Sequence, residues 1–178
     1  TQVEDLKILE QAFAQPNLPL TLFGHSRGGV ATLLAVGRGD VSANRVIALS
    51  SPCDCVSMSK EDQQRLLDEG RIESPSSRTG QMLYVGKCFL EEQLESPECH
   101  NLLTLAAGIT VPCLIIHGED DPTVSVHSAV TLAETIPKST LARIAGGDHV
   151  FNTPNPFPIA GDPSTQLNAV WHSISSWL

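Results

Sequence analysis

A serine lies between glycines where an apolar segment, "LPLTLF" (18–23), ends and a run of small and aliphatic residues, 28–36, begins. The stretch Gly24-His25-Ser26-Arg27-Gly28 fits the pattern G-x-S-x-G. Where a strand turns sharply into a helix at such a pattern, the serine hydroxyl is exposed and the first amides of the helix face any negative charge that develops beside it. The pattern therefore predicts a nucleophile at Ser26, with the backbone N–H of Arg27 as an oxyanion donor.

The same residues also fit a glycine-rich turn in which Ser26 only caps the following helix. G-x-S-x-G is short enough to arise by chance, so the choice between these interpretations depends on the rest of the chain. A serine nucleophile needs a base that takes its proton, and the base needs an acid that orients it.

Two downstream segments supply an acid and a base in the chain order that this turn requires, which is serine, acid, histidine. "LIIHGEDDPTV" places Asp120 and Asp121 directly after an apolar segment, and "IAGGDHVF" places His149 after the next one. If both apolar segments are parallel strands, their C-terminal ends meet at the same edge of the sheet as the serine. We therefore expect His149 to be the base and one of the two aspartates to orient it.

The segments "GHSRGG", "HGEDDPTV" and "GGDHVF" resemble the nucleophile elbow, the acid segment and the histidine loop of the α/β-hydrolases. The resemblance covers essentially the whole chain and implies a catalytic triad of Ser26, His149 and Asp121. Asp120 remains the alternative acid, because a one-residue shift in the turn would exchange the two. The resemblance implies a hydrolase that cleaves small-molecule carboxylic esters, or thioesters or amides, through an acyl-enzyme without a cofactor.

The remaining histidines are interpreted as structural. His25 precedes the nucleophile, where this family often has a structural histidine, and His117 opens the acid turn, where it can satisfy backbone groups. Asp148 is next to His149 in the sequence, but sequential neighbours rarely face each other in the geometry that a triad needs. No metal-ligand cluster, phosphate-binding loop or dinucleotide fingerprint is found.

The resemblance also implies upstream elements that have no counterpart in this chain. The family fold has eight strands with the elbow after the fifth, whereas here only one helical pattern, 3–15, precedes the elbow. The loop that carries the second oxyanion donor is among the missing parts. We expect the chain to be the C-terminal half of the fold, with 18–23 as an exposed edge strand that invites self-association into a homo-oligomer.

Two other functions are also compatible with the sequence. A non-catalytic or truncated binding module would explain the missing oxyanion loop. An acyltransferase would use the same three residues with an alcohol or an amine in place of water.

Apolar segments and helical patterns alternate over most of the chain, which is typical of a parallel sheet covered on both faces. We predict a single α/β domain over residues 1–178, a three-layer αβα sandwich with a mostly parallel sheet. The expected further strands are 45–51, 113–118 and 139–146, and the expected helices after the elbow are 125–136 and 163–178.

Residues 53–110 contain no good strand pattern. "SKEDQQRLLDEG" begins with Ser59 as a helix cap, with Asp62 three residues later as its partner. "QMLYVGKCFLEEQLES" and "HNLLTLAA" continue with helical patterns. We therefore expect a helical excursion between two strands, in the place of a lid.

Composition excludes several kinds of partner. The chain has 178 residues, a formal net charge of −9 and no block of Lys and Arg, so binding to nucleic acid or to an acidic membrane surface is not expected. The longest apolar tract, 102–116, is too short to span a bilayer. The five cysteines are odd in number, without a C-x-x-C pair or zinc spacing, which favours free thiols in a reducing compartment and a cytoplasmic location.

Overall fold

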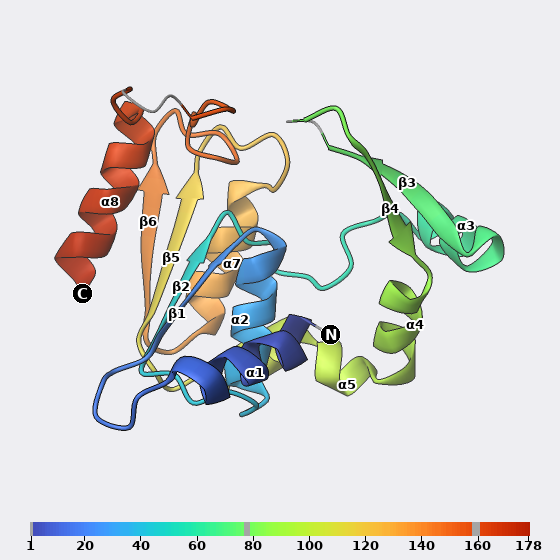
Figure 1. Ribbon diagram of the computed structural model, residues 1–178, viewed down its shortest axis with the longest axis horizontal. Helices are drawn as coiled ribbons and strands as arrows, with labels where there is room; N and C mark the ends of the chain where they lie inside the picture. The colour runs from blue at the N-terminus through green and yellow to red at the C-terminus, as the bar shows by residue number, and fades with distance from the viewer. Residues whose placement is uncertain (1, 77–78, 158–160) are drawn as a thin grey trace.

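The computed structural model describes residues 2–76, 79–157 and 161–178. Its centre is a four-stranded sheet in the order β1-β2-β5-β6, and every strand pair in it is parallel. The strands are β1 (Thr21–His25), β2 (Arg45–Leu49), β5 (Cys113–Gly118) and β6 (Ser139–Ile144). All six residues of β5 are buried, as are four of the five in β2, because these central strands have helices on both faces (Figure 1).

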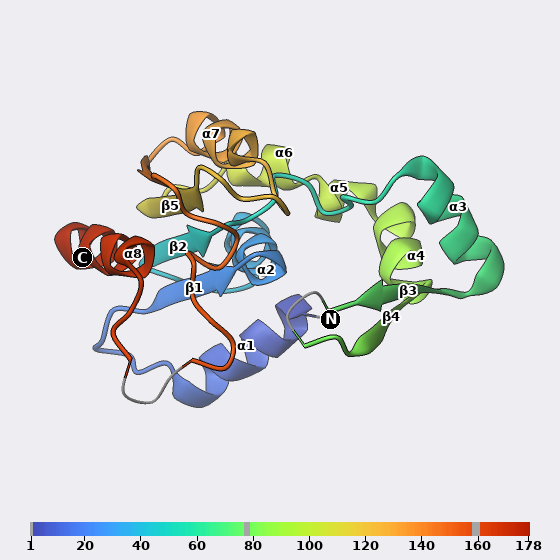
Figure 2. The same ribbon diagram turned by 90° about the horizontal axis from the view of Figure 1, so that it is seen from above.

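Helices cover the two faces of the sheet unequally (Figure 2). On one face lie α2 (Arg27–Gly37), α6 (Leu102–Ala106) and α7 (Val126–Thr135), with α1 (Gln2–Phe13) beside α2. On the other face lies α8 (Thr165–Trp177). The core is accordingly divided into a large cluster under α2 and α7 and a smaller one under α8. The predicted three-layer α/β architecture with a parallel sheet is confirmed.

Most predicted elements are found within a few residues of their expected bounds. The strand expected at 18–23 is an exception, since β1 begins at Thr21 and runs to His25. Pro19 has no N–H for a ladder, and the N–H of Leu20 donates to the side chain of Asn44 at 2.7 Å rather than to a strand. The strand therefore ends directly at the elbow.

The first strand of the sheet has an open edge. Among the described residues β1 pairs only with β2, and the side chain of Phe23 in the middle of β1 is 56% exposed. This agrees with the expectation of an apolar edge strand.

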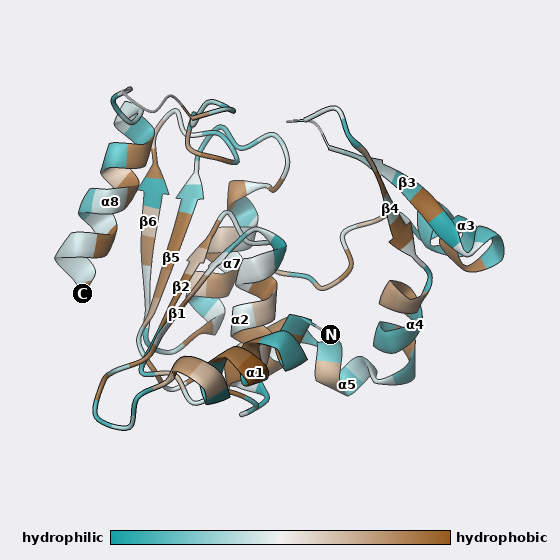
Figure 3. Cartoon of the chain, viewed as in Figure 1, coloured by the Kyte–Doolittle hydropathy of each residue, from teal (hydrophilic) through white to brown (hydrophobic). Residues whose placement is uncertain are grey.

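The excursion between β2 and β5 is not wholly helical, so that part of the sequence interpretation is wrong. It holds α3 (Lys60–Glu69), α4 (Cys88–Glu95) and α5 (Pro97–His100), but also an antiparallel hairpin of β3 (Arg71–Pro75) and β4 (Met82–Gly86). The four apolar residues that open "MLYVG" favour a strand once a partner is available, because tyrosine and valine suit a pleated surface. Figure 3 shows hydrophobic residues along β4, whereas much of α3 is hydrophilic.

The cap expected at the start of α3 is confirmed. The hydroxyl of Ser59 accepts a hydrogen bond from the N–H of Asp62 at 3.0 Å and donates one to its carboxylate at 2.9 Å. None of the helices in the described ranges has the length and apolar character needed to cross a membrane.

All five cysteines are free thiols, and their burial predicts very different reactivity. Burial raises the pKa of Cys113 to about 12 and also raises the pKa of Cys55, whereas Cys88 is exposed. Because the thiolate is the reactive form, iodoacetamide should label Cys88 long before Cys113 in the folded protein. Peptide mapping over time measures the order. Labelling in urea is the control that removes burial, and equal rates for both thiols without urea would contradict the prediction.

Candidate active site

Ser26 occupies the turn between β1 and α2 in a strained backbone conformation, with φ 55° and ψ −121°. Few non-glycine residues adopt a positive φ, and such strain persists only where the surroundings fix it. Here the N–H of Ser26 donates to the carbonyl of Leu49 at 2.8 Å, which ties the turn to the neighbouring strand. Ser26 stands at the N-cap position of α2, but its side chain makes no capping hydrogen bond. The interpretation of Ser26 as a simple helix cap is therefore wrong.

Glycines make the sharp turn possible. A Cβ on Gly24 would lie 2.2 Å from the carbonyl oxygen of Gly28, which is backbone and cannot move aside. A Cβ on Gly29 would lie 2.7 Å from the Cβ of Ser51. β1 and α2 can therefore approach this closely only without a side chain at Gly24, and α2 can approach the segment after β2 only without one at Gly29.

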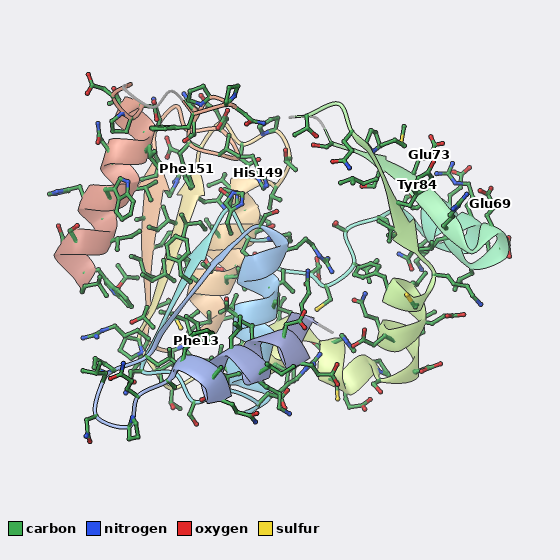
Figure 4. All side chains as sticks on the ribbon, viewed as in Figure 1. Phe13, Glu69, Glu73, Tyr84, His149 and Phe151 are labelled. Carbon is green, nitrogen blue, oxygen red and sulfur yellow. The ribbon has the colours of Figure 1, made fainter. Side chains whose placement is uncertain are left out.

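The side chain of Ser26 faces His149, which lies 123 residues away in the sequence. The hydroxyl of Ser26 and Nε2 of His149 are 3.0 Å apart, and Nδ1 of His149 is 2.8 Å from Oδ2 of Asp121. With a neutral imidazole, Nδ1–H donates to the carboxylate and Nε2 accepts from the hydroxyl. The three residues named from the sequence thus form one continuous chain of hydrogen bonds at the upper end of the large sheet, where Figure 4 labels His149.

The side chain of Asp121 is fully buried, and three N–H groups donate to its carboxylate. Its Oδ1 accepts from the N–H groups of Thr123 at 2.8 Å and Val124 at 2.9 Å. Its Oδ2 lies 2.8 Å from Nδ1 of His149 and 3.3 Å from Nε2 of the buried His117. These contacts replace the water that the charge loses on burial.

The alternative acid, Asp120, lies outside this arrangement. Its side chain is exposed, and its N–H donates to the carbonyl of Gly147 at 3.0 Å. Of the two candidate aspartates, the structure thus brings only Asp121 to the histidine.

The loop that carries His149 is held by a set of bonds that the sequence interpretation missed. Oδ1 of Asp148 accepts from the N–H groups of Val150 and Asn152, and Oδ1 of Asn152 accepts from the N–H of Asp148. Phe151 and Asn152 both have a positive φ, and Phe151 is buried in the core under α8. Asp and Asn near each other are a turn signal, so the five-residue spacing of "DHVFN" was the available clue.

Two further contacts fix the position of the histidine. Nε2 of His25 donates to the carbonyl of His149 at 2.7 Å, so the residue before the nucleophile holds the backbone of the loop. A Cβ on Gly118 would lie 2.2 Å from the carbonyl oxygen of Gly147, because the acid turn and the histidine loop touch through their backbones. His25 and His117 are thus bound to backbone carbonyls, as the sequence interpretation held.

The backbone and the side chain of Arg27 have different surroundings in the site. Its N–H lies in the first turn of α2, where a helix has no internal acceptor for it. Its side chain points toward the excursion, where Nη1 donates to the carbonyl of Cys55 and the guanidinium lies 4.6 Å from the ring centroid of Phe89. Burial lowers the pKa of the Arg27 guanidinium. In the described part of the chain, no group of three or more His, Cys, Asp or Glu side chains could hold a metal ion.

Comparison with solved structures identifies the fold as that of the α/β-hydrolases. The chain is 23% identical to the esterase domain of a Rhodothermus marinus protein, with a TM-score of 0.64, covering 99% of this chain and 68% of that one. It is 17% identical to Est1E from Butyrivibrio proteoclasticus in complex with ferulic acid, with a TM-score of 0.68, covering 99% and 65%. It is 16% identical to the monoacylglycerol lipase of Paleococcus ferrophilus, with a TM-score of 0.70, and the match covers 99% of this chain and 75% of that one.

These similarities establish the fold and leave the activity open. The chain spans about two thirds of the length of the first structures it matches, so it is a smaller portion of the fold. No protein-family model and no curated protein matches the sequence.

Gly24 in β1 and Gly28 in α2 should respond oppositely to substitution by alanine. Gly24→Ala should destabilise the protein by about 2 kcal/mol or more, since its methyl group meets backbone. Gly28→Ala should change stability by less than about 1 kcal/mol, in the stabilising direction, because a Cβ there meets nothing within 4 Å and alanine favours a helix. Urea unfolding followed by circular dichroism measures both, and equal losses would contradict the proposed backbone contact.

Proposed function

We propose that this chain carries the catalytic residues of a serine hydrolase that cleaves carboxylic esters. The observation that supports it is the hydrogen-bond chain from Asp121 through His149 to Ser26, at the end of a parallel sheet. The similar structures include an esterase domain and a lipase, which favours esters among the acyl compounds. Thioesters and amides have the same acyl carbon and are the next candidates.

The first half of the proposed reaction forms an acyl-enzyme. Nε2 of His149 takes the hydroxyl proton of Ser26 while Oγ of Ser26 attacks the acyl carbon of the ester. The π electrons of the carbonyl group move onto the carbonyl oxygen. The carboxylate of Asp121 stabilises the imidazolium through Nδ1–H without taking the proton itself. The tetrahedral intermediate then collapses, the ester C–O bond breaks, and His149 delivers the proton to the leaving alkoxide. An alcohol departs.

Water completes the cycle through the same residues. His149 removes a proton from a water molecule, whose oxygen attacks the acyl carbon of the Ser26 ester. When this second intermediate collapses, the bond from carbon to Oγ breaks and the proton on His149 returns to Oγ. A carboxylic acid leaves and the starting state is restored.

The backbone N–H of Arg27 is the proposed donor to the oxyanion in both intermediates. Loss of one such donor costs about 10²–10³ in rate, so a second donor from a longer form of the protein would raise activity by this factor. In the same proposal the open edge of β1 pairs with a further strand, either from that longer form or from a second copy of the chain.

Covalent capture tests the nucleophile directly. A fluorophosphonate probe should label the protein at Ser26, identified by peptide mass spectrometry, because phosphonylation requires the same activated hydroxyl as acylation. Ser26→Ala should abolish labelling, and His149→Ala should slow it by at least about 10³. Thr32→Ala is the matched control for a buried hydroxyl in the helix after the elbow and should label normally. Labelling at another residue would overturn the assignment of Ser26 as the nucleophile. Absence of labelling in any form of the protein that contains the upstream strands would favour a non-catalytic binding module.

The two neighbouring aspartates give a matched pair for the acid. Asp121→Asn should lower the rate of labelling and of ester hydrolysis by about 10³–10⁴, because an amide places its N–H or oxygen against Nδ1 without the charge that stabilises the imidazolium. Asp120→Asn should leave both rates within about twofold, because its side chain is exposed. Hydrolysis of p-nitrophenyl acetate provides the rates, and the opposite ranking of the two variants would overturn the assignment.

A further inference from the structure

Ser26, Ser50 and His117 lie in one row across the carboxyl-terminal edge of the large sheet. In the parallel pairs of this sheet, a backbone N–H donates to the carbonyl of the residue that precedes its register partner. The bond from Ser26 N–H to Leu49 therefore places Ser26 opposite Ser50, and the bond from Ser50 N–H to Ile116 places Ser50 opposite His117. β2 and β5 are neighbours at the centre of the sheet (Figure 1), where adjacent strands are about 4.8 Å apart.

The side chains of Ser50 and His117 are buried, and each has one polar atom without a partner. Both residues are 0% exposed, and among the described residues Oγ of Ser50 and Nδ1 of His117 find no hydrogen-bond partner. Nε2 of His117 donates to the carbonyl of Val124 at 2.9 Å, so in a neutral ring Nδ1 is a bare acceptor, whereas the hydroxyl of Ser50 can donate. A buried polar group that lacks a hydrogen bond is unfavourable, and native structures rarely leave one unexplained. The two atoms are of complementary kinds and belong to residues that face each other on neighbouring strands.

The ring of His117 is linked to the carboxylate of the proposed triad through one residue. Val124 accepts from Nε2–H of His117 through its carbonyl, and its own N–H donates to Oδ1 of Asp121 at 2.9 Å. Nε2 of His117 also lies 3.3 Å from Oδ2 of Asp121. With the ring proton on Nδ1 instead, Nε2 would turn a lone pair toward a carbonyl oxygen and a carboxylate. The acid turn is therefore held only by the tautomer of His117 that carries its proton on Nε2.

We infer that Oγ–H of Ser50 donates to Nδ1 of His117, and that His117 is thereby a positioning residue for Asp121. Rotation about the Cα–Cβ bond of Ser50 moves Oγ without any change in the backbone, and the bond satisfies both unpartnered atoms. It keeps the ring proton on Nε2, where it holds Val124. Ser50 has a φ of 46°, and such strained residues occur where the surroundings fix them, often at functional sites. This step rests on the proposed function, in which Asp121 orients the catalytic base.

The tautomer and the proposed bond can be observed without turnover. Long-range ¹H–¹⁵N correlation spectra of protein labelled with ¹⁵N-histidine distinguish protonated from bare ring nitrogens, and His117→Gln identifies the signals of His117 by their loss. We expect the proton on Nε2 and a hydrogen-bonded Nδ1. Ser50→Ala should shift the Nδ1 signal downfield, toward that of a nitrogen without a hydrogen bond. Ser51→Ala removes the neighbouring buried hydroxyl, which donates to Pro52, and should leave the signal in place. A proton on Nδ1, or no shift in Ser50→Ala, would overturn the pair.

Two amides at position 117 test whether the ring positions the carboxylate. The amide nitrogen of glutamine reaches about as far as Nε2 of histidine and that of asparagine about as far as Nδ1, so only His117→Gln can still donate to Val124. The signal of Nδ1–H of His149, which reports the bond to Asp121, should move in His117→Asn and stay in His117→Gln. For p-nitrophenyl acetate, His117→Asn should lower kcat at least about tenfold with KM within about twofold, because a displacement of about 1 Å can cost about 10²-fold. His117→Gln should keep kcat within about threefold of the wild type. Equal values of kcat for the two amides would overturn the positioning role.

Ser50→Ala provides the second test of that role if His117→Asn does not fold. It should lower kcat about fivefold, the net value of a typical hydrogen bond, and leave KM unchanged. Ser51→Ala is the matched control and should keep both constants. Equal kcat in the two alanine variants would contradict the positioning role, whatever the stability of the variants at position 117.

These measurements fail independently of the proposed function. Fluorophosphonate labelling at Ser26 together with an unshifted Nδ1 signal in Ser50→Ala would retain the hydrolase and overturn this inference. A hydrogen-bonded Nδ1 without labelling, in a form of the protein that contains the upstream strands, would retain the pair of Ser50 and His117 and overturn both its catalytic role and the hydrolase.

Discussion

The buried carboxylate of Asp121 is the interaction on which the arrangement of the site depends. A carboxylate without partners is very unfavourable in a low-dielectric interior, so the loops around it must present donors. Two come from the backbone of its own turn, and the third comes from His149 beyond β6. The same charge thereby closes the acid turn and holds the histidine ring in the orientation that reaches Ser26.

The parallel sheet makes this convergence possible. β1, β5 and β6 end at one edge, and the serine, the aspartate and the histidine each follow one of those ends. Between β1 and β5 lies β2, whose last residue accepts the hydrogen bond from Ser26 N–H and so stabilises the left-handed turn. The strain at Ser26 is maintained by a strand that contributes no residue to the hydrogen-bond chain.

Sequence patterns predicted the parts of this structure that depend on short segments. The buried strands, the elbow and the order of serine, acid and histidine are local features, and Ser59 with Asp62 is a local cap. The resemblance already favoured Asp121 over Asp120, and the backbone of the acid turn brings Asp121 to the histidine. The bonds between Asp148 and Asn152 depend on two residues with a positive φ and could not be predicted in this way. The hairpin was missed because "MLYVG" becomes a strand only when β3 pairs with it, and pairing is not visible in a window of residues.

The excursion and the sheet have separate tasks in the proposed enzyme. None of Ser26, Asp121 and His149 belongs to residues 53–110, although α6 within that range packs on the sheet and contributes Leu102 and Ala106 to its core. A cavity of about 850 Å³ has one wall from α2 and another from the excursion. Arg27 is the link between them, because its N–H lies in the first turn of α2 and its side chain binds the excursion.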